Sequence, residues 1–531
     1  MRALLSKTIQ RRLHLIESLA HLNTWVAVDQ LVQLLDCTDK TLMKDMEIIN
    51  DEWEEYLQID FSKRKGLMIR GGQTNKIKNV YQQVLRESTE FQFLERIFFD
   101  PTQDADYWMK KLYLSETSFY RMVRQLTKAL KRHGLTLQRK PFCLVAEDER
   151  WVRLFYESYF EETYGGDLWP FETDEQETFC FLMRTTTDFD VLLDNRQILQ
   201  HAYLFMVTCI RASQGFLLNQ EIYDEPEDII EQLITISKKY VEQLLEGTSY
   251  ILVDGWVREI SHGVFYEFYN WANPQQELRI KLAVDRFLDK FVRAVDYPLP
   301  AEDRKKIGQQ MMHWYLSYTI YPYDRVILRD ECEEPARGIR TLYPIFSKMV
   351  TINLQEIEKE CNFPWAKTRE ADILCALISE WEGLPLRLEE RRRQVHLLVV
   401  SDRGIKHGKM LRDLLKGQLY NKVTIDIYQG FVLFVPPEEL KEFQRYDIVL
   451  ANNPIEGYHE DNLLLVDNFI SEVDWGRLNK AIIQMQRKKS REYLRKLDQG
   501  KLRSGRDVYP QQARKISNFL FEEESDSFFE L

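Results

Sequence analysis

The sequence has few of the features that metal, thiol or nucleotide chemistry requires. Its seven cysteines lie far apart and none belongs to a CxxC pair, so neither a zinc ribbon nor a redox dithiol is supported. The phosphate-loop pattern GxxxxGK[ST] and the dinucleotide pattern GxGxxG are both missing. We therefore expect reduced thiols, no metal, no cofactor and no enzymatic activity.

Long apolar runs are missing as well. No stretch approaches the ~18 residues of a membrane-spanning helix, and the start MRALLSKTIQRR lacks the apolar core and cleavage site of a secretion signal. The odd number of cysteines argues against a complete disulfide framework. These absences predict a cytoplasmic protein without membrane contact.

Acidic charge is in excess, but it is spread unevenly. The 531 residues suffice for several packed domains, and the net charge of −12 taken alone speaks against a polyanionic partner. Residues 1–150, however, carry 24 basic and 21 acidic side chains, which leaves −15 for the remainder. An acidic chain of this kind can still hold a local face that binds a polyanion.

Residues 1–72 have the pattern of a winged helix-turn-helix. Apolar spacing predicts helices over 7–21 and 28–35, followed by a third helix that Thr38 caps. The alternating segment LQIDFSKRKGLMIRG then predicts a hairpin. The cations expected at its tip are Lys63, Arg64 and Lys65, and the outward residues of the third helix are Lys40, Thr41 and Lys44.

The same pattern recurs over residues 73–150. Helices are predicted over 76–87, 91–99 and 105–112, then a helix that Ser115 caps and a second hairpin. One such copy could be an ordinary helical corner, but two copies with basic hairpins favour DNA, because a recognition helix fits the major groove while cations contact phosphate. The residues expected at this second interface are Thr117, Arg121, Arg124, Arg139 and Lys140.

From residue 151 to about 390 the sequence is helical and rich in aromatic residues. It contains a faint repeat, HAYL from His201 and HWYL from His313, 112 residues apart. A lone histidine in a helix is more often structural than functional, and the repeat makes the two alternatives about even for this pair.

From Gln394 onward, strand-like and helical segments alternate as in a small parallel α/β domain. The loop SDRGIKHG follows the first strand, where such folds bind phosphate, although Gly404 and Gly408 could serve the turn alone. The last stretch is basic and then acidic, which is typical of a solvated helix and tail; pairing with the DNA-binding third or with a second subunit is the alternative.

The order of these parts, together with the junction EDERWVRLFYESYFEETYGGDLWPF, resembles the Mga and AtxA family of virulence regulators from Gram-positive bacteria. The resemblance covers almost the whole chain and by length is closer to Mga. It implies a multidomain, mainly α fold: tandem winged helices (1–72 and 73–150), two all-helical phosphotransferase-system regulation domains (151–280 and 281–391), an α/β enzyme IIB-like domain (392–487) and a tail (488–531).

In the resembled family, each regulation domain commonly carries two histidines that the phosphocarrier protein of the sugar phosphotransferase system phosphorylates. His201 matches the first position of the first domain, and His262, 61 residues further on, fits the second. His313 fits the first position of the second domain, whereas the same step beyond it falls on Leu374. The resemblance therefore implies phosphorylation at His201, His262 and His313.

Active enzyme IIB modules carry a cysteine directly after the first strand, and here that position is Ser401. A serine hydroxyl is far less nucleophilic than a thiolate, and the adjacent Asp402 would repel phosphate. We interpret this part as a silent dimerisation or sensing domain.

The sequence as a whole predicts a cytoplasmic transcription activator of virulence or surface-protein genes. Its implied partners are promoter double-stranded DNA, RNA polymerase, the phosphocarrier protein, and a second copy bound through the C-terminal domain. One alternative is an enzyme IIB-type phosphocarrier, against which the missing cysteine argues. The other is an antiterminator that binds RNA, which would begin with a small all-β module instead of paired helix-turn-helix units.

Overall fold

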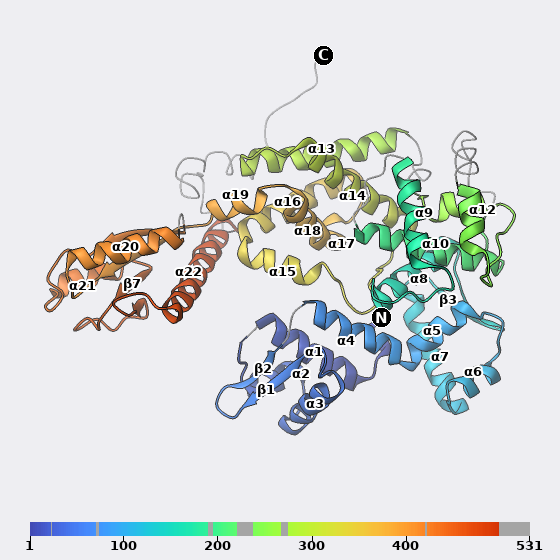
Figure 1. Cartoon of the computed structure of the whole chain (residues 1–531), viewed down its shortest axis with the longest axis horizontal. Helices are drawn as coiled ribbons and strands as arrows, with labels where there is room; N and C mark the ends of the chain where they lie inside the picture. Colours follow the sequence, from blue (N-terminus) through green and yellow to red (C-terminus); the bar gives the residue numbers. More distant parts are fainter. Residues whose placement is uncertain are drawn as a thin grey trace, which may run out of the picture. The chain divides into compact units, whose positions relative to one another are not determined.

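The computed structural model describes residues 1–22, 24–70, 74–188, 195–219, 237–266, 274–419 and 422–498, and it is mostly helical (Figure 1). The chain divides into two compact units. The first comprises Met1–Gln276 and His313–Glu331, and the second comprises Glu277–Met312 and Cys332–Leu531. In the described ranges, no helix is both long enough and apolar enough to cross a membrane.

The first unit begins with a short 3-10 helix, three α-helices and a hairpin. The backbone of Val26 pairs with Leu67 in the hairpin, with N–O distances of 2.8 and 2.9 Å in the two directions, so the hairpin is fixed to the segment before the second helix. The elements are η1 (Arg2–Leu4), α1 (Lys7–Leu22), α2 (Val28–Leu35), α3 (Asp39–Glu52), β1 (Gln58–Ser62) and β2 (Gly66–Arg70).

A second set of helices ends in another antiparallel hairpin. Its core is a group of edge-to-face rings, Phe93, Phe119 and Phe142, whose centroids lie 5.5 to 5.6 Å apart. This cluster holds the hairpin against the capped helix. The elements are α4 (Thr74–Glu87), α5 (Thr89–Phe99), α6 (Ala105–Lys111), α7 (Glu116–Lys131), β3 (Thr136–Arg139) and β4 (Phe142–Val145).

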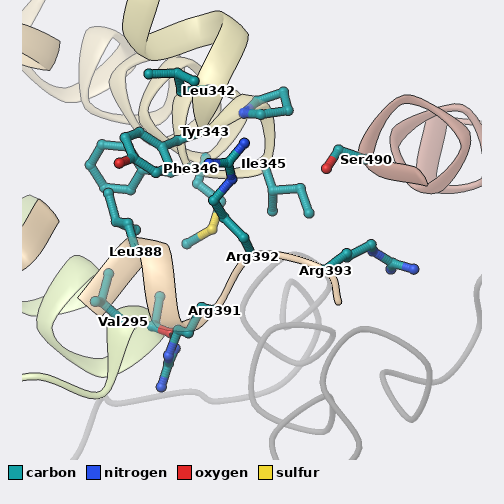
Figure 2. A pocket seen from close by; sticks show the side chains of 13 residues that line it. Val295, Leu342, Tyr343, Ile345, Phe346, Leu388, Arg391, Arg392, Arg393 and Ser490 are labelled. Atoms are coloured by element: carbon teal, nitrogen blue, oxygen red, sulfur yellow. The ribbon is translucent and has the colours of Figure 1, made fainter. Parts of the chain in front are cut away.

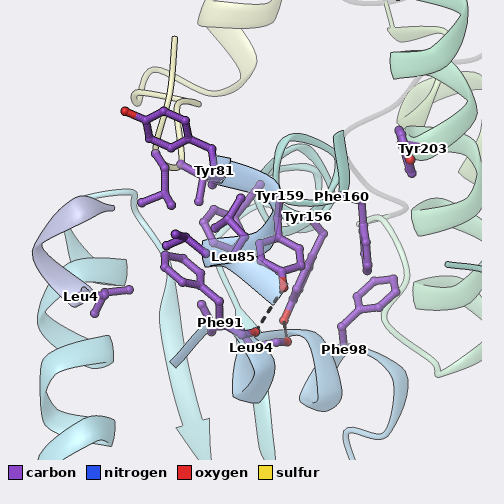
Figure 3. Packing of buried hydrophobic residues seen from close by; sticks show 14 of the residues in the cluster. Leu4, Tyr81, Leu85, Phe91, Leu94, Phe98, Tyr156, Tyr159, Phe160 and Tyr203 are labelled. Atoms are coloured by element: carbon purple, nitrogen blue, oxygen red, sulfur yellow. Dashed lines mark hydrogen bonds between the residues drawn. The ribbon is translucent and has the colours of Figure 1, made fainter. Parts of the chain in front are cut away.

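The remaining helices of the first unit include α8, which lies in the junction segment, and pack around α10, which contacts α8, α9 and α12. Tyr156 of α8 donates its hydroxyl hydrogen to the carbonyl of Leu94 at 3.0 Å. The hydroxyl of Tyr159, also on α8, lies 2.8 Å from a carboxylate oxygen of Glu95 and 3.3 Å from the carbonyl oxygen of Phe91 (Figure 3). These bonds allow two tyrosines to be fully buried. The helices are α8 (Glu149–Tyr164), α9 (Glu175–Asp188), α10 (Asn195–Ser213) and α12 (Trp256–Gly263).

A run of helices leads into the second unit. The chain passes between the units at three points: between Gln276 and Glu277 in α13, between Met312 and His313 in α14, and between Glu331 and Cys332. The helices are α13 (Pro274–Val295), α14 (Ala301–Ile320), α15 (Glu333–Leu342), α16 (Pro344–Cys361), α17 (Trp365–Thr368), α18 (Glu370–Glu380) and α19 (Leu384–Glu390).

The second unit also contains the small parallel sheet that the sequence predicts. Its strand order is β6-β5-β7-β8, and it buries apolar side chains on both faces: Leu397 and Val399 belong to one core cluster, Leu398 and Val400 to the other. The elements are β5 (Val395–Val400), α20 (Ile405–Leu419), β6 (Val423–Ile427), α21 (Pro437–Phe443), β7 (Ile448–Ala451), β8 (Leu463–Leu465) and α22 (Glu472–Asp498).

The first hairpin depends on Gly66. Its φ is +94°, and a Cβ atom there would lie 1.9 Å from the carbonyl oxygen of Val26. We expect Gly66→Ala to destabilise the hairpin by at least about 2 kcal/mol, because both the backbone strain and the clash are with main-chain atoms. Hydrogen exchange over residues 58–70 measures this.

Gly417→Ala is the matched control. Gly417 lies in α20 with open space around it, so alanine should be neutral or stabilise by about 0.5 to 1 kcal/mol. Unchanged exchange in the Gly66 variant would contradict the assigned strain.

Candidate nucleic-acid interface and histidine sites

The orientation of α3 is fixed by buried polar contacts. Asp45, 3% exposed, accepts hydrogen bonds from Arg11 at 2.6 Å and from Arg12 at 3.2 Å, both on α1. The amide of Asn50 bonds both backbone groups of Ile59 at 2.6 and 2.9 Å, which ties α3 to β1. Helix and hairpin therefore form one rigid body.

The predicted recognition residues lie on the outward face of this helix. Lys40 and Lys44 are exposed and Thr41 is half-buried. The helix begins as expected, because Thr38 Oγ1 accepts the backbone N–H of Thr41 at 3.2 Å. The three residues share a surface from which two cations extend into solvent.

The tip of the first hairpin is cationic as well. Lys63, Arg64 and Lys65 are all exposed. The ammonium of Lys65 lies 5.7 Å from the ring centroid of Trp25. Trp25 was not among the predicted interface residues, because no local sequence pattern links it to a residue forty positions further on.

The second helix and hairpin repeat this arrangement. Thr117, Arg121 and Arg124 are exposed on α7, and Arg139 and Lys140 are exposed between β3 and β4. The hydroxyl of Ser115 caps α7 at the N–H of Ser118, 3.3 Å away. All the predicted DNA-contact residues are thus exposed or half-buried.

His201 lies in α10 and is only 7% exposed. Its Nδ1 is 2.8 Å from the carbonyl oxygen of Gln197. Because a carbonyl can only accept, Nδ1 carries the hydrogen of this bond; in the neutral form of the ring the lone pair is then on Nε2.

His313, half-buried in α14, lies beside His201. The two ring centroids are 6.3 Å apart, and the ring of Tyr266 stacks on His313 at 5.8 Å. Phe265 lies 6.3 Å from the His201 ring. The family resemblance assigns these histidines to matching positions in separate predicted domains, and a separation of 112 residues in the sequence does not indicate that they are neighbours.

His262 in α12 is almost completely buried, with 1% exposure. Burial, and then the nearby charges of Arg150 and Arg258, lower the pKa of His262 to about 4. The ring is therefore neutral at pH 7, and α12 would have to open before another protein could reach it.

The loop after β5 holds Ser401 in a closed network. Ser401 Oγ lies 2.8 Å from Nδ1 of His407, whose Nε2 donates to the carbonyl of Asn468 at 2.7 Å. Nδ1 is then an acceptor, so the serine hydroxyl donates to it, and the same oxygen accepts the N–H of Arg403 at 3.2 Å. Ser401 is 5% exposed.

Asp402 follows directly and accepts hydrogen bonds from the side chains of Asn452 and Asn453. The bond from Asn452 is the main reason that its pKa is below the usual value. A negative charge thus stands where an incoming phosphate would have to bind. Within the described ranges, no cluster of three or more His, Cys, Asp or Glu side chains could hold a metal ion.

Comparison with known proteins supplies the relatives of this chain. Residues 73–160 match the Mga helix-turn-helix domain. A protein described as a trans-acting regulator from Streptococcus pneumoniae serotype 4 is 23% identical, over 88% of this chain and 96% of its own length. The chain is related to the Mga and AtxA regulators.

Two Bacillus anthracis relatives of the Mga and AtxA type match shorter parts. The capsule synthesis positive regulator AcpA is 25% identical over 47% of this chain and 50% of its own length. The anthrax toxin expression trans-acting positive regulator is 24% identical over 30% of this chain and 33% of its own length. These relatives are named as positive regulators, and the helix-turn-helix match includes α7 and its hairpin.

The low pKa of His262 predicts a pH-dependent stability. Because its folded pKa, about 4, is below the unfolded value near 6.5, its contribution is complete above pH 6.5 and is lost as the pH falls toward 4. We expect wild type to lose stability relative to His262→Leu by up to about 1.4 kcal/mol per pH unit in this window. Denaturant unfolding at pH 7, 6 and 5 measures the difference; parallel curves would contradict the assigned pKa.

Proposed function

We propose that the chain is a DNA-binding transcription activator that holds promoter DNA through its first 150 residues. The observation that carries the proposal is that two helix-and-hairpin units each present exposed cations on a capped helix and on the adjacent hairpin tip. Such a helix fits the major groove, and cationic hairpins fit the flanking phosphates. The named activity of the relatives supports activation, and by analogy the targets are virulence or surface-protein genes.

The cations on the helices and those on the hairpin tips have different expected roles. Both sets consist of Lys and Arg, so the division follows their position: Lys40, Lys44, Arg121 and Arg124 lie on the helices that would enter the groove, whereas the hairpin tips would contact the flanking phosphates. Activation in the cytoplasm then requires contact with RNA polymerase.

The rival functions fit the described contacts less well. A phosphocarrier of the enzyme IIB type needs an accessible nucleophile, whereas the Ser401 hydroxyl is buried and hydrogen-bonded, with Asp402 beside it. An antiterminator that binds RNA would need an all-β module at the start, where α1 to α3 lie.

A second copy of the chain is the proposed partner of the C-terminal domain. Parallel strands place the loops after β5, β6 and β8 at one edge of the sheet. These loops carry three phenylalanines that are 67 to 72% exposed, Phe431, Phe434 and Phe469. Several exposed aromatic rings at one edge are typical of a surface that binds a partner. This apolar rim, formed by the three phenylalanines, is the surface that we expect a second copy to cover, because the polar groups of Ser401 and His407 are already hydrogen-bonded.

Regulation by phosphorylation is proposed for the histidines. The Nε2 lone pair of His201 would attack the phosphorus of the carrier's phosphohistidine, forming one N–P bond as the carrier's N–P bond breaks. The hydrogen on Nδ1 and its bond to Gln197 stay in place. His313 is the second candidate, and His262 would accept phosphate only after α12 opens.

The consequence is electrostatic. A phosphoryl group brings about two negative charges to a ring that is 7% exposed and lies beside His313 and Phe265. Arg211 further along α10 cannot compensate, because Glu149 binds its guanidinium at 2.7 and 2.8 Å. The contact between α10 and α14 must therefore rearrange.

The DNA contact is tested by changing Lys63, Arg64 and Lys65 together to Ala. Affinity should fall about equally for all duplexes, and the slope of log K against log salt should decrease by roughly 2 to 3, since each phosphate contact contributes about 0.9. The triple variant of Lys406, Lys409 and Lys416 on α20 removes equal charge and should leave binding unchanged. A wild-type slope in the hairpin variant would exclude this tip from DNA.

The switch is tested by comparing His201→Ala and His201→Asp in a promoter reporter, in cells with and without transported sugar. Aspartate supplies part of the phosphoryl charge and alanine none, so the two variants should differ severalfold in activation or in dimer strength by sedimentation. His459→Asp, at an exposed histidine, is the control. Equal behaviour of both variants and wild type would leave His201 with a structural role only.

A further inference from the structure

The second unit contains a small cavity that neither DNA binding nor the histidines use. It lies among the end of α13, the α15–α16 junction, α19 and α22, and its volume is about 60 Å³. Figure 2 shows an apolar side formed by Tyr343, Phe346 and Leu388, with Ser490 of α22 across from it. The consecutive residues Arg391, Arg392 and Arg393 complete the lining.

The charge of the cationic lining is only partly neutralised by neighbouring groups. Arg392 is bound to Glu389 at 3.1 Å, and the guanidinium of Arg393 lies 4.6 Å from the ring centroid of Tyr493. In the part of the chain that the structure describes, no group accepts the hydrogens on Nε and Nη2 of Arg393, although both atoms are buried. Arg391 donates to the carbonyl of Ala294 at 2.9 Å and lies 3.7 Å from Asp296. Three guanidinium groups therefore meet two carboxylates, and the positive charge that is left favours an anionic occupant.

The size of the cavity restricts that occupant further. Sites for nucleotides or drug-sized ligands measure about 300 to 1,000 Å³, so 60 Å³ holds about one side chain. An apolar side chain flanked by carboxylates fits both the apolar wall and the arginines.

The chain itself carries such a segment. Residues 519–531 read FLFEEESDSFFEL, in which aromatic residues stand on both sides of a run of carboxylates. Helix α22 carries Ser490 at the cavity and ends at Asp498, about 12 Å further along its axis. The intervening residues 499–518 can span up to about 66 Å, so the tether permits return to the cavity at a local concentration in the millimolar range.

We propose that residues 519–531 dock into this cavity of their own chain, with a phenylalanine ring against Tyr343 and Phe346 and with Glu522–Glu524 facing Arg392 and Arg393. Docking covers the joint between α16 and α22, which pack together in the second unit. This inference is independent of DNA binding and of histidine phosphorylation.

The test is photo-crosslinking in the full-length protein. Benzoylphenylalanine replaces Phe528, the sample is irradiated, and mass spectrometry locates the products in a mixture of isotopically heavy and light chains. We expect crosslinks to the peptides that contain Tyr343–Met349 and Leu388, joining peptides of the same isotope, with a yield that falls as salt rises from 0.1 to 0.5 M.

Charge variants complete the design. Glu522→Lys, Glu523→Lys and Glu524→Lys together should lower the yield at least about fivefold without touching the folded core. Adding Arg392→Glu and Arg393→Glu to that variant should restore it, whereas Lys409→Glu with Lys416→Glu should change nothing in the wild-type background. Crosslinks between different copies, crosslinks elsewhere, or yields that ignore charge reversal would each overturn the proposal.

Discussion

The burial of α8 is the constraint on which the first unit depends. Arg153 of this helix is completely buried and bound to Glu259 of α12 at 2.5 Å. Glu149, also on α8, binds Arg211 of α10 at 2.7 Å. Because removing one partner of a buried ion pair costs about 3 to 5 kcal/mol, these pairs fix α10 and α12 in one register against α8.

The fixed positions of α10 and α12 restrict how the structure could respond to a phosphoryl charge on a histidine of either helix. His201 lies on α10 and His262 on α12, the two helices that the ion pairs hold. From His201 to Ala212 every residue of α10 is buried, so the helix cannot turn to carry a new charge into solvent. A structural change that accommodates the charge therefore has to occur in the neighbouring helix α14, where His313 lies beside His201. The rigid contacts of α10 with α8 thus leave the His201–His313 contact as the place where an added charge would be accommodated.

Locally coded features could be predicted from the sequence. Thr38 and Ser115 cap helices within their own turns. The helices predicted over 7–21, 28–35, 76–87, 91–99 and 105–112 begin and end within two residues of α1, α2, α4, α5 and α6. The small parallel C-terminal sheet is also confirmed, because its strands are short apolar runs that alternate with helical segments along the chain. Contacts made by distant packing could not be predicted, such as His201 against His313, or the burial that is the main cause of the low pKa of His262. The domain boundaries implied by the family resemblance stay predictions.

At one edge of the C-terminal sheet, the polar side chains are hydrogen-bonded to one another and the aromatic side chains are exposed. The hydroxyl of Ser401 and the carboxylate of Asp402 are both engaged in local hydrogen bonds, whereas the aromatic residues around them are exposed. Covering three rings that are about 70% exposed would contribute roughly 4 to 6 kcal/mol, and association costs about 4 to 15 kcal/mol in lost freedom. The rim can therefore set where a second copy binds, but a stable dimer requires additional buried area from the neighbouring elements.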